Sequence, residues 1–258
     1  MCRMFAVRGS HEFASSLQKA LISAAESDDF RNPIGSHDNG WGGVWYSIGE
    51  QKYYRSVTPI FKDKIASNFF NGDSRESHDS LMGLSHARLA AKGEPIRGPF
   101  DSHPFSTHIG EELVYVTHNG HINKFKIRDE AGVRDPSTMN DTEVFTFLME
   151  RMKGSSSLRR LEEAIKLARD VGALEGALNL MVLSVNRNGE KNIYYHCEFP
   201  NIGRELYYSL YFLRQDTENL AVMSSTIAFK TGLISYKGEP LIHKVSMCPR
   251  SRTLVLSS

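Results

Sequence analysis

The order of the hydrophobic patterns along the chain is the feature that most limits its possible folds. Apolar residues with the alternation of β-strands dominate both ends of the sequence, and two helical patterns stand next to each other between them. In the first helical pattern Val144, Leu148 and Met152 share one face, and Asn140 and Glu143 match a capping box at its start. This order differs from the strict strand–helix alternation of parallel sheets, so it predicts an α+β fold with two antiparallel sheets and helices packed outside them.

The remaining elements follow from the same periodicities. The second helical pattern covers 158–171 and ends at Gly172, and a further amphipathic helix is predicted over 13–27, after an opening strand at 2–7. The other expected strands are 43–48, 52–58, 81–88, 113–117, 177–186, 192–198, 205–213, 220–224 and 253–257. Because no repeat or low-complexity linker divides the sequence, we expect one domain over residues 1–258.

Composition excludes several classes of function. The net charge is +1 and charges of both signs are interspersed, so the sequence indicates no nucleic-acid partner. It has no apolar run long enough to span a membrane and no signal-peptide pattern. The three cysteines form no CxxC pair, which fits a reducing cytosol. The histidine pairs 103/108 and 118/121 lack the usual zinc-site partners. We therefore expect a soluble cytoplasmic protein without a metal or cofactor.

The second residue of the chain is a cysteine, Cys2. Removal of Met1, which a small second residue usually permits, would leave the thiol and a free α-amine on one residue. The thiolate is the reactive species, and an adjacent amine can accept its proton, as in enzymes with an N-terminal threonine. Taken alone, Cys2 is better interpreted as an ordinary residue of the first strand.

Four polar or glycine-rich segments stand at the ends of apolar runs. They are 37–42 (His-Asp-Asn-Gly-Trp-Gly), 85–90 (Ser-His-Ala-Arg-Leu-Ala), 117–121 (Thr-His-Asn-Gly-His) and 140–143 (Asn-Asp-Thr-Glu). Together with Cys2 they resemble, in order and spacing, the class II glutamine amidotransferases, which are N-terminal-nucleophile hydrolases. The chain is most similar to stand-alone members, which share the HxxGWG stretch and the triplet at 103–105. The resemblance covers nearly the whole chain and implies a four-layer αββα sandwich.

The resemblance implies catalytic roles for Cys2, Asn119 and Gly120. Amide hydrolysis passes through a tetrahedral intermediate whose oxyanion needs preorganised hydrogen-bond donors. The Asn119 side-chain amide and the Gly120 backbone N–H can supply such donors, and glycine lets the backbone approach closely. The alternative for this Asn-Gly pair is an ordinary turn after a strand.

The resemblance also implies residues that hold the substrate. Glutamine carries a carboxylate and an ammonium group; the Arg88 guanidinium suits the carboxylate, and Asp141 can hold the ammonium. The alternatives are a surface ion pair for Arg88 and a favourable helix-start position for Asp141. Gly40 and Trp41 would form a supporting loop beside the nucleophile, and His86 would satisfy a buried hydrogen bond there.

The implied reaction is release of ammonia from glutamine through a thioester on Cys2. No synthase pattern follows in the sequence, so any ammonia acceptor or synthase is expected on a separate chain. Ala91 stands where many members have threonine after the arginine, and Asn39 replaces a more usual acidic residue. These departures leave two alternatives open: a hydrolase of γ-glutamyl peptides or conjugates, and a non-catalytic glutamine-binding regulatory subunit.

Overall fold

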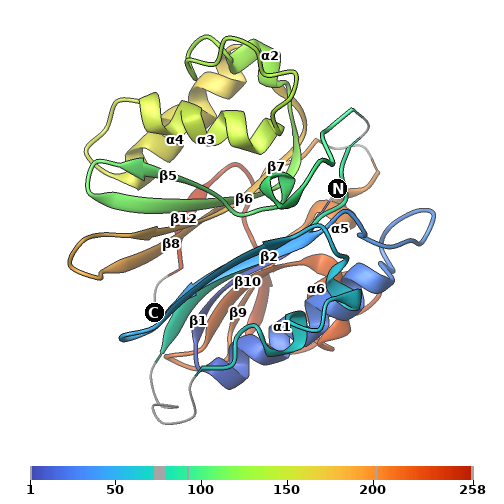
Figure 1. The fold of residues 1–258 in the computed structure, drawn as a ribbon. Coiled ribbons are helices and arrows are strands. Elements are labelled where there is room, and N and C mark those ends of the chain that lie inside the picture. The colour runs from blue at the N-terminus through green and yellow to red at the C-terminus, as the bar shows by residue number, and fades with distance from the viewer. Residues whose placement is uncertain (1, 73–79, 92, 201–202, 257–258) are drawn as a thin grey trace.

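The computed structural model describes residues 2–72, 80–91, 93–200 and 203–256. Two antiparallel sheets form its centre (Figure 1). The larger sheet has the order β11-β9-β10-β1-β4-β2-β3. Its strands are β1 (Arg3–Gly9), β2 (Trp41–Tyr46), β3 (Gln51–Ser56), β4 (Leu81–Ala87), β9 (Leu210–Arg214), β10 (Leu220–Ser224) and β11 (Val245–Met247).

The smaller sheet has the order β12-β8-β7-β6-β5 and faces the larger one. Its strands are β5 (Phe105–Ile109), β6 (Glu112–Ile122), β7 (Leu174–Val185), β8 (Lys191–His196) and β12 (Thr253–Val255). The turn between β7 and β8 contains the predicted Asn188-Gly189 hairpin dipeptide, with Gly189 at a φ of 80°.

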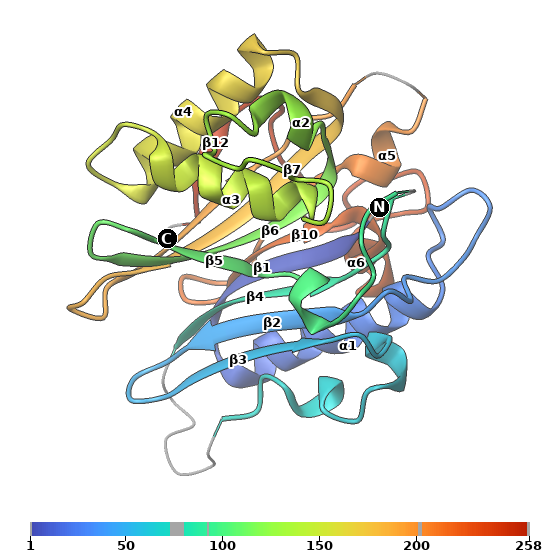
Figure 2. The same cartoon turned by 45° about the horizontal axis from the view of Figure 1, so that its top comes forward.

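Helices cover the outer face of each sheet (Figure 2). On the larger sheet lie α1 (His11–Glu26) and α6 (Ser225–Lys230); beside the smaller lie α2 (Lys124–Ile127), α3 (Asp141–Arg151) and α4 (Ser157–Asp170). The shorter α5 (Glu205–Tyr208) and the 3-10 turns η1 (Ile60–Lys62), η2 (Ala66–Asn68) and η3 (Pro99–Asp101) lie in connections. Three apolar clusters separate the four layers, and the predicted α+β sandwich of two antiparallel sheets with flanking helices is confirmed.

The alternation of side chains along β1 shows how the central strand serves two of these layers. Phe5 and Val7 pack in the cluster beneath α1, whereas Met4 and Ala6 pack between the sheets. Both faces of β1 are therefore buried, which explains why its sequence reads as a nearly continuous apolar run. Continued by two residues, the alternation turns the side chain at position 2 towards the smaller sheet.

Several predicted details are confirmed. Asn140 and Glu143 form the capping box of α3. Gly172, at a φ of 65°, follows the last turn of α4. The prediction of one strand over 205–213 is wrong, because α5 occupies the first half of this segment and β9 only the second.

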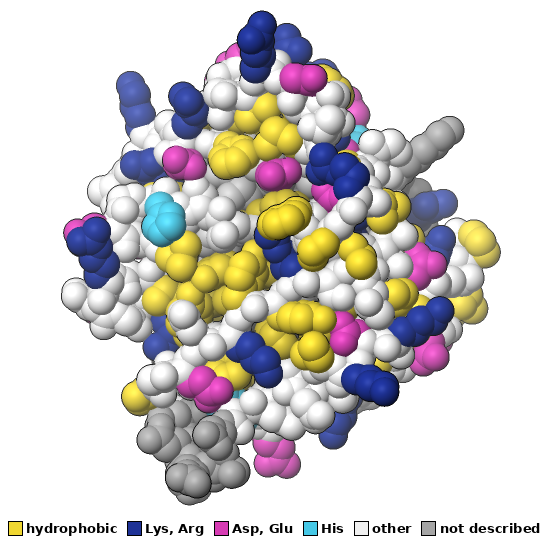
Figure 3. All heavy atoms as spheres, viewed as in Figure 1, with side chains coloured by type: hydrophobic (Ala, Val, Ile, Leu, Met, Phe, Trp, Pro, Cys, Tyr) yellow, Lys and Arg dark blue, Asp and Glu magenta, His cyan; other side chains and the backbone are white. Residues whose placement is uncertain are grey.

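The surface is mixed in charge on the face that Figure 3 shows. Basic and acidic side chains are interspersed there, and apolar side chains gather in a hollow near the middle of the view. Among the helices that the structure describes, none is both long and apolar enough to cross a membrane.

Candidate active site

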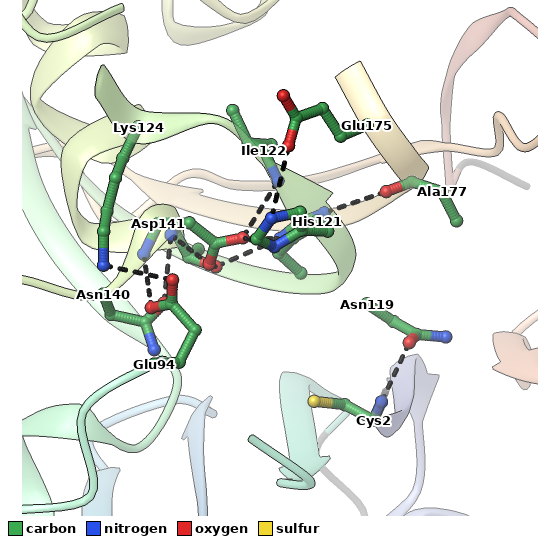
Figure 4. Close-up of polar contacts among 12 residues, drawn as sticks. Cys2, Glu94, Asn119, His121, Ile122, Lys124, Asn140, Asp141, Glu175 and Ala177 are labelled. Carbon is green, nitrogen blue, oxygen red and sulfur yellow. Dashed lines mark hydrogen bonds and ion pairs between the residues drawn. The ribbon is translucent and has the colours of Figure 1, made fainter. Parts of the chain in front are cut away.

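Cys2 lies immediately before β1, between the two sheets. Its backbone N–H donates a hydrogen bond of 2.9 Å to Oδ1 of Asn119, which belongs to β6 of the opposite sheet (Figure 4). Its Sγ lies 3.7 Å from the carbonyl oxygen of Leu89, in the segment that follows β4. The cysteine is 7% exposed. Asn119 on β6 and Leu89 after β4, both distant in the sequence, thus lie next to Cys2.

Asn119 and Gly120 both lie inside β6, so the alternative of a turn is wrong for this pair. The Asn119 side chain is buried, and its Nδ2 has no hydrogen-bond partner among the described residues. Buried amide donors are nearly always satisfied, so Nδ2 is a candidate donor to a bound group. In the view of Figure 4, Nδ2 and Sγ of Cys2 lie on opposite sides of the Cys2–Asn119 hydrogen bond.

Gly120 is required by packing as well as by any catalytic role. A Cβ built at this position would overlap the carbonyl oxygen of Ala177 on β7 and would approach the His118 ring. The glycine therefore allows β6 and β7 to come close together, directly beside Asn119.

Arg88 follows β4 and is 2% exposed, so the alternative of a surface ion pair is wrong. Its Nη2 donates to the carbonyl oxygen of Pro95 at 2.7 Å, and within the described ranges it makes no salt bridge with a carboxylate. Its backbone is held in place by two hydrogen bonds. The Arg88 N–H donates to the Gly40 carbonyl oxygen, and the Asn39 N–H donates to the Arg88 carbonyl oxygen. A buried guanidinium without a carboxylate partner is a candidate site for an anionic group of a ligand.

Asp141 is the first residue of α3, and its carboxylate is already engaged by the protein. It accepts hydrogen bonds from the backbone N–H groups of Ile122 and Thr142, at 3.0 and 2.7 Å. It also lies 3.7 Å from Nδ1 of His121 (Figure 4). Nδ1 of His118 lies 3.9 Å away. The helix-start contact is thus present, and it holds the carboxylate next to the strand that carries Asn119.

Glu94 and Lys124 complete this corner, and the sequence pattern gave no sign of them. Glu94 accepts a hydrogen bond from the backbone N–H of Asp141 and forms a buried salt bridge of 3.1 Å with Lys124 (Figure 4). Burial and the neighbouring Asp141 carboxylate raise the pKa of Glu94. The segment after Arg88 is thereby attached to the start of α3.

Three buried histidines connect the segments that carry Arg88, Asn119 and Asp141. His86 donates from Nε2 to the His118 carbonyl at 3.1 Å, and its ring centroid lies 4.0 Å from that of His103. The Thr142 hydroxyl lies 2.9 Å from Nε2 of His103 and 3.1 Å from Nδ1 of His118. His86 thus makes a buried hydrogen bond, as expected.

Burial also sets the protonation of these rings. It lowers the pKa of His86 to about 3, and it lowers the pKa values of His103 and His118 as well. Burial in low dielectric disfavours the imidazolium form, so all three rings are neutral at pH 7. They position the site and carry no charge in it.

The prediction that Trp41 lies in a loop is wrong. Trp41 is the first residue of β2, is fully buried, and packs against Phe69 and Tyr54 in the cluster beneath α1. Its Nε1 donates to Asp63 at 2.9 Å. Gly40 does lie in the preceding loop, with a φ of 101°. Its carbonyl oxygen accepts the hydrogen bond from the Arg88 N–H.

A buried ion group next to Cys2 was missed by the sequence reasoning. Asp28 accepts from Nε of Arg3 at 2.7 Å and lies 2.7 Å from Nε2 of His37; all three side chains are fully buried. Burial acts to raise the pKa of Asp28, but the Arg3 charge and the two hydrogen bonds outweigh it and hold that pKa well below its usual range. Burial lowers the pKa of His37 to about 4.

The other two cysteines lie away from these residues. Cys197 and Cys248 are buried in the cluster between the sheets, and burial raises the pKa of both thiols, that of Cys197 to about 11. They are protonated at neutral pH and therefore unreactive. Among the described residues, no three His, Cys, Asp or Glu side chains are grouped so as to hold a metal ion.

Comparisons with known proteins agree with this geometry. The family model for class-II glutamine amidotransferases matches residues 1–214. The allosteric regulatory enzyme of purine biosynthesis has a similar fold, with a TM-score of 0.63 and 17% identity over 99% of this chain and 47% of its own. This chain therefore spans about half the length of that enzyme.

A predicted glutamine amidotransferase from Pseudomonas aeruginosa PA01 aligns over 99% of this chain and 96% of its own, with 13% identity and a TM-score of 0.47. No curated protein gives a significant match. Since the family model covers most of the sequence, the chain belongs to the class II glutamine amidotransferases.

Proposed function

We propose that the protein hydrolyses the side-chain amide of glutamine, with Cys2 as its nucleophile after removal of Met1. The observation that carries this proposal is the hydrogen bond between the Cys2 nitrogen and Oδ1 of Asn119, made across the two sheets. It holds the nitrogen and sulfur of one residue beside a buried amide whose donor is unpaired. These are the groups that acyl transfer at an N-terminal nucleophile needs.

The proposed reaction proceeds in two steps. The α-amine takes the thiol proton, and the thiolate attacks the side-chain carbonyl carbon to form a C–S bond. The proton then passes to the amide nitrogen, the C–N bond breaks, and ammonia leaves a γ-glutamyl thioester on Cys2. Water attacks the thioester, releasing glutamate and restoring the thiol.

The residues around Cys2 divide into two tasks in this proposal. Asn119 and Gly120 stabilise the oxyanion, which requires the Asn119 amide to turn so that Nδ2 faces the intermediate. Arg88 binds the α-carboxylate of the substrate, because its buried guanidinium lacks a carboxylate partner. Asp141 faces the α-ammonium group with the part of its carboxylate that the backbone leaves free.

Intact mass spectrometry tests the proposal. Protein processed to begin at Cys2 is expected to gain the mass of one 6-diazo-5-oxo-norleucine adduct, after loss of N₂, and to lose ammonia release from glutamine in parallel. A regulatory subunit without chemistry would bind glutamine but release no ammonia, which would reject the proposal. Protein that retains Met1 is the internal control, since its Cys2 nitrogen is an amide and cannot act as a base.

Asn119 can be tested separately for its two hydrogen-bonding roles. Asn119→Asp keeps an oxygen that can accept from Cys2 but removes the Nδ2 donor, whereas Asn119→Ala removes both. We expect Asn119→Asp to lower kcat by about 10²–10³-fold with KM nearly unchanged, the usual cost of one oxyanion-hole donor. A kcat of Asn119→Asp within a factor of three of the wild type would show that the residue only positions Cys2.

A further inference from the structure

A cavity of about 750 Å³ opens beside Leu89, on the side of α5 and of the loop between α1 and β2. Figure 2 shows α5 and this loop at the same edge of the molecule as the start of β1. Leu89 connects the cavity with the nucleophile: it is part of the lining, and its carbonyl oxygen lies 3.7 Å from Sγ of Cys2. Tyr207, also in its lining, packs its ring 4.0 Å from the guanidinium of Arg3, the residue that follows Cys2.

The cavity is separate from the residues assigned to glutamine. None of Arg88, Asn119, Gly120 and Asp141 lines it. Arg88 instead turns its guanidinium towards Pro95, on the side of α3. An amide carbonyl attacked by Sγ has the glutamyl carbons on one side and the leaving nitrogen on the other. With the glutamyl end at Arg88 and Asp141, the leaving group is directed to the cavity.

Four aromatic residues line the cavity: Phe30, Tyr207, Tyr208 and Tyr236. The ring centroids of Phe30 and Tyr236 lie 5.6 Å apart with the rings tilted by 48°, and the rings of Tyr207 and Tyr208 meet edge to face at 5.2 Å. Tyr236 is 64% exposed at the rim, although it is a large side chain. Such walls give apolar contact area that ammonia could not use.

Two arginines bring positive charge to the same cavity. Arg31 and Arg204 line it, and neither makes a salt bridge with a described carboxylate. Arg31 donates only to the backbone, at Ser36. The acid Asp29 in the lining is itself paired with Lys230 at 2.7 Å. Glu205 also lines the cavity, where it accepts a hydrogen bond from the Gly203 backbone N–H at 3.1 Å. Arg31 and Arg204 are therefore the cations of the lining that can pair with a carboxylate on the ligand.

We infer that this cavity holds the leaving group of a γ-glutamyl amino acid with an apolar or aromatic side chain. Its α-carboxylate pairs with Arg31 or Arg204, and its side chain packs against Tyr236 and Phe30. The inference rests on the proposed function and keeps its chemistry: the thiolate attacks the γ-carbonyl, the amino acid leaves with the proton on its nitrogen, and water resolves the thioester.

The test compares four substrates on processed protein: glutamine, γ-Glu-Gly, γ-Glu-Phe and the C-terminal amide of γ-Glu-Phe. We expect kcat/KM for γ-Glu-Phe to exceed that for glutamine by at least about tenfold. Amidation of the Phe carboxylate should lower kcat/KM about tenfold, because it removes a charge-assisted hydrogen bond. Hydrolysis of glutamine without preference for γ-Glu-Phe would overturn the inference and leave the proposed function standing. Hydrolysis of none of the four would overturn both.

Single variants then assign the contacts. Arg31→Gln and Arg204→Gln are compared with Arg214→Gln, which removes an exposed arginine elsewhere, at the end of β9. Arg31→Gln or Arg204→Gln, or both, should lower kcat/KM for γ-Glu-Phe about tenfold. Neither variant should change kcat/KM for glutamine or for the amidated substrate. Tyr236→Ser should lower kcat/KM for γ-Glu-Phe more than kcat/KM for γ-Glu-Gly. If neither arginine variant narrows the gap between γ-Glu-Phe and its amide, the assignment of the carboxylate is wrong.

Discussion

Replacement of Cys2 by serine is expected to reduce turnover of glutamine and of γ-glutamyl substrates by at least about 10⁴-fold, as loss of a catalytic nucleophile usually does. A serine hydroxyl is far harder to deprotonate than a thiol, and it is the weaker nucleophile at a site that holds a thiol. The measurements are the release of ammonia or amino acid and the capture of the diazo-ketone analogue by mass. Both should be lost together.

The fold should survive this substitution. The Cys2 side chain makes one weak contact, with the Leu89 carbonyl, and the backbone hydrogen bond to Asn119 is unaffected. Melting temperature and glutamine binding should therefore stay close to wild type. Cys248→Ala is the matched control: it also removes a buried thiol, but one whose pKa burial raises. Retention of more than about 1% activity in Cys2→Ser, a barrier change below about 3 kcal/mol, would contradict the role assigned to the thiol.

Acid should unfold the protein at an unusually mild pH. The folded chain lowers the pKa of His37 to about 4 and that of His86 to about 3, whereas an unfolded histidine titrates near 6.5. Between these values the unfolded state binds protons that the folded state excludes. Stability is therefore complete above about pH 6.5 and falls as the pH is lowered. At pH 5 each of the two rings lowers the free energy of unfolding by about 2 kcal/mol, so together they lower it by about 4 kcal/mol.

His103 and His118 act in the same direction, because burial also lowers their pKa values. Urea unfolding at pH 7.5, 6.5, 5.5 and 5.0 measures the effect. In His86→Gln the slope of unfolding free energy against pH should become shallower by about 1.4 kcal/mol per pH unit, the share of one proton. His243→Gln, which removes an exposed histidine, should leave the slope unchanged. Equal stability at pH 5 and pH 7.5 would show that the buried rings are protonated in the folded state.

The sequence predicts the fold well where burial is regular. The two faces of β1 and the apolar stripes of α3 and α4 lie where the periodicities place them. It fails at 205–213, where Tyr207 and Tyr208 resemble strand residues but form a single helical turn. In that turn Tyr207 packs over the buried Arg3, almost the whole length of the chain away. The short strands β5 and β11 were also missed, because pairing with β6 and β9 defines them rather than length or pattern.

The site shows the same division. Cys2 and Asn119 were both chosen from the sequence and are in direct contact, since each lies in a motif with its own chemical signature. Glu94, Lys124 and Asp28 carry no such signature. Each acquires its role from a partner on another element, and only the folded chain brings the pairs together. Trp41 was misplaced for the opposite reason: its glycine neighbours suggested a loop, whereas its ring completes the core beneath α1.

The place of β1 in the larger sheet also sets an order of events in the cell. β1 lies between β4 and β10, so the sheet closes around it only once residues 220–224 have been translated. An aminopeptidase must draw a nascent terminus into its own catalytic centre, and the residue after the first methionine is almost inaccessible in the finished protein. The removal of Met1 that the proposed function requires is therefore expected while the chain is still on the ribosome, before its last strands emerge.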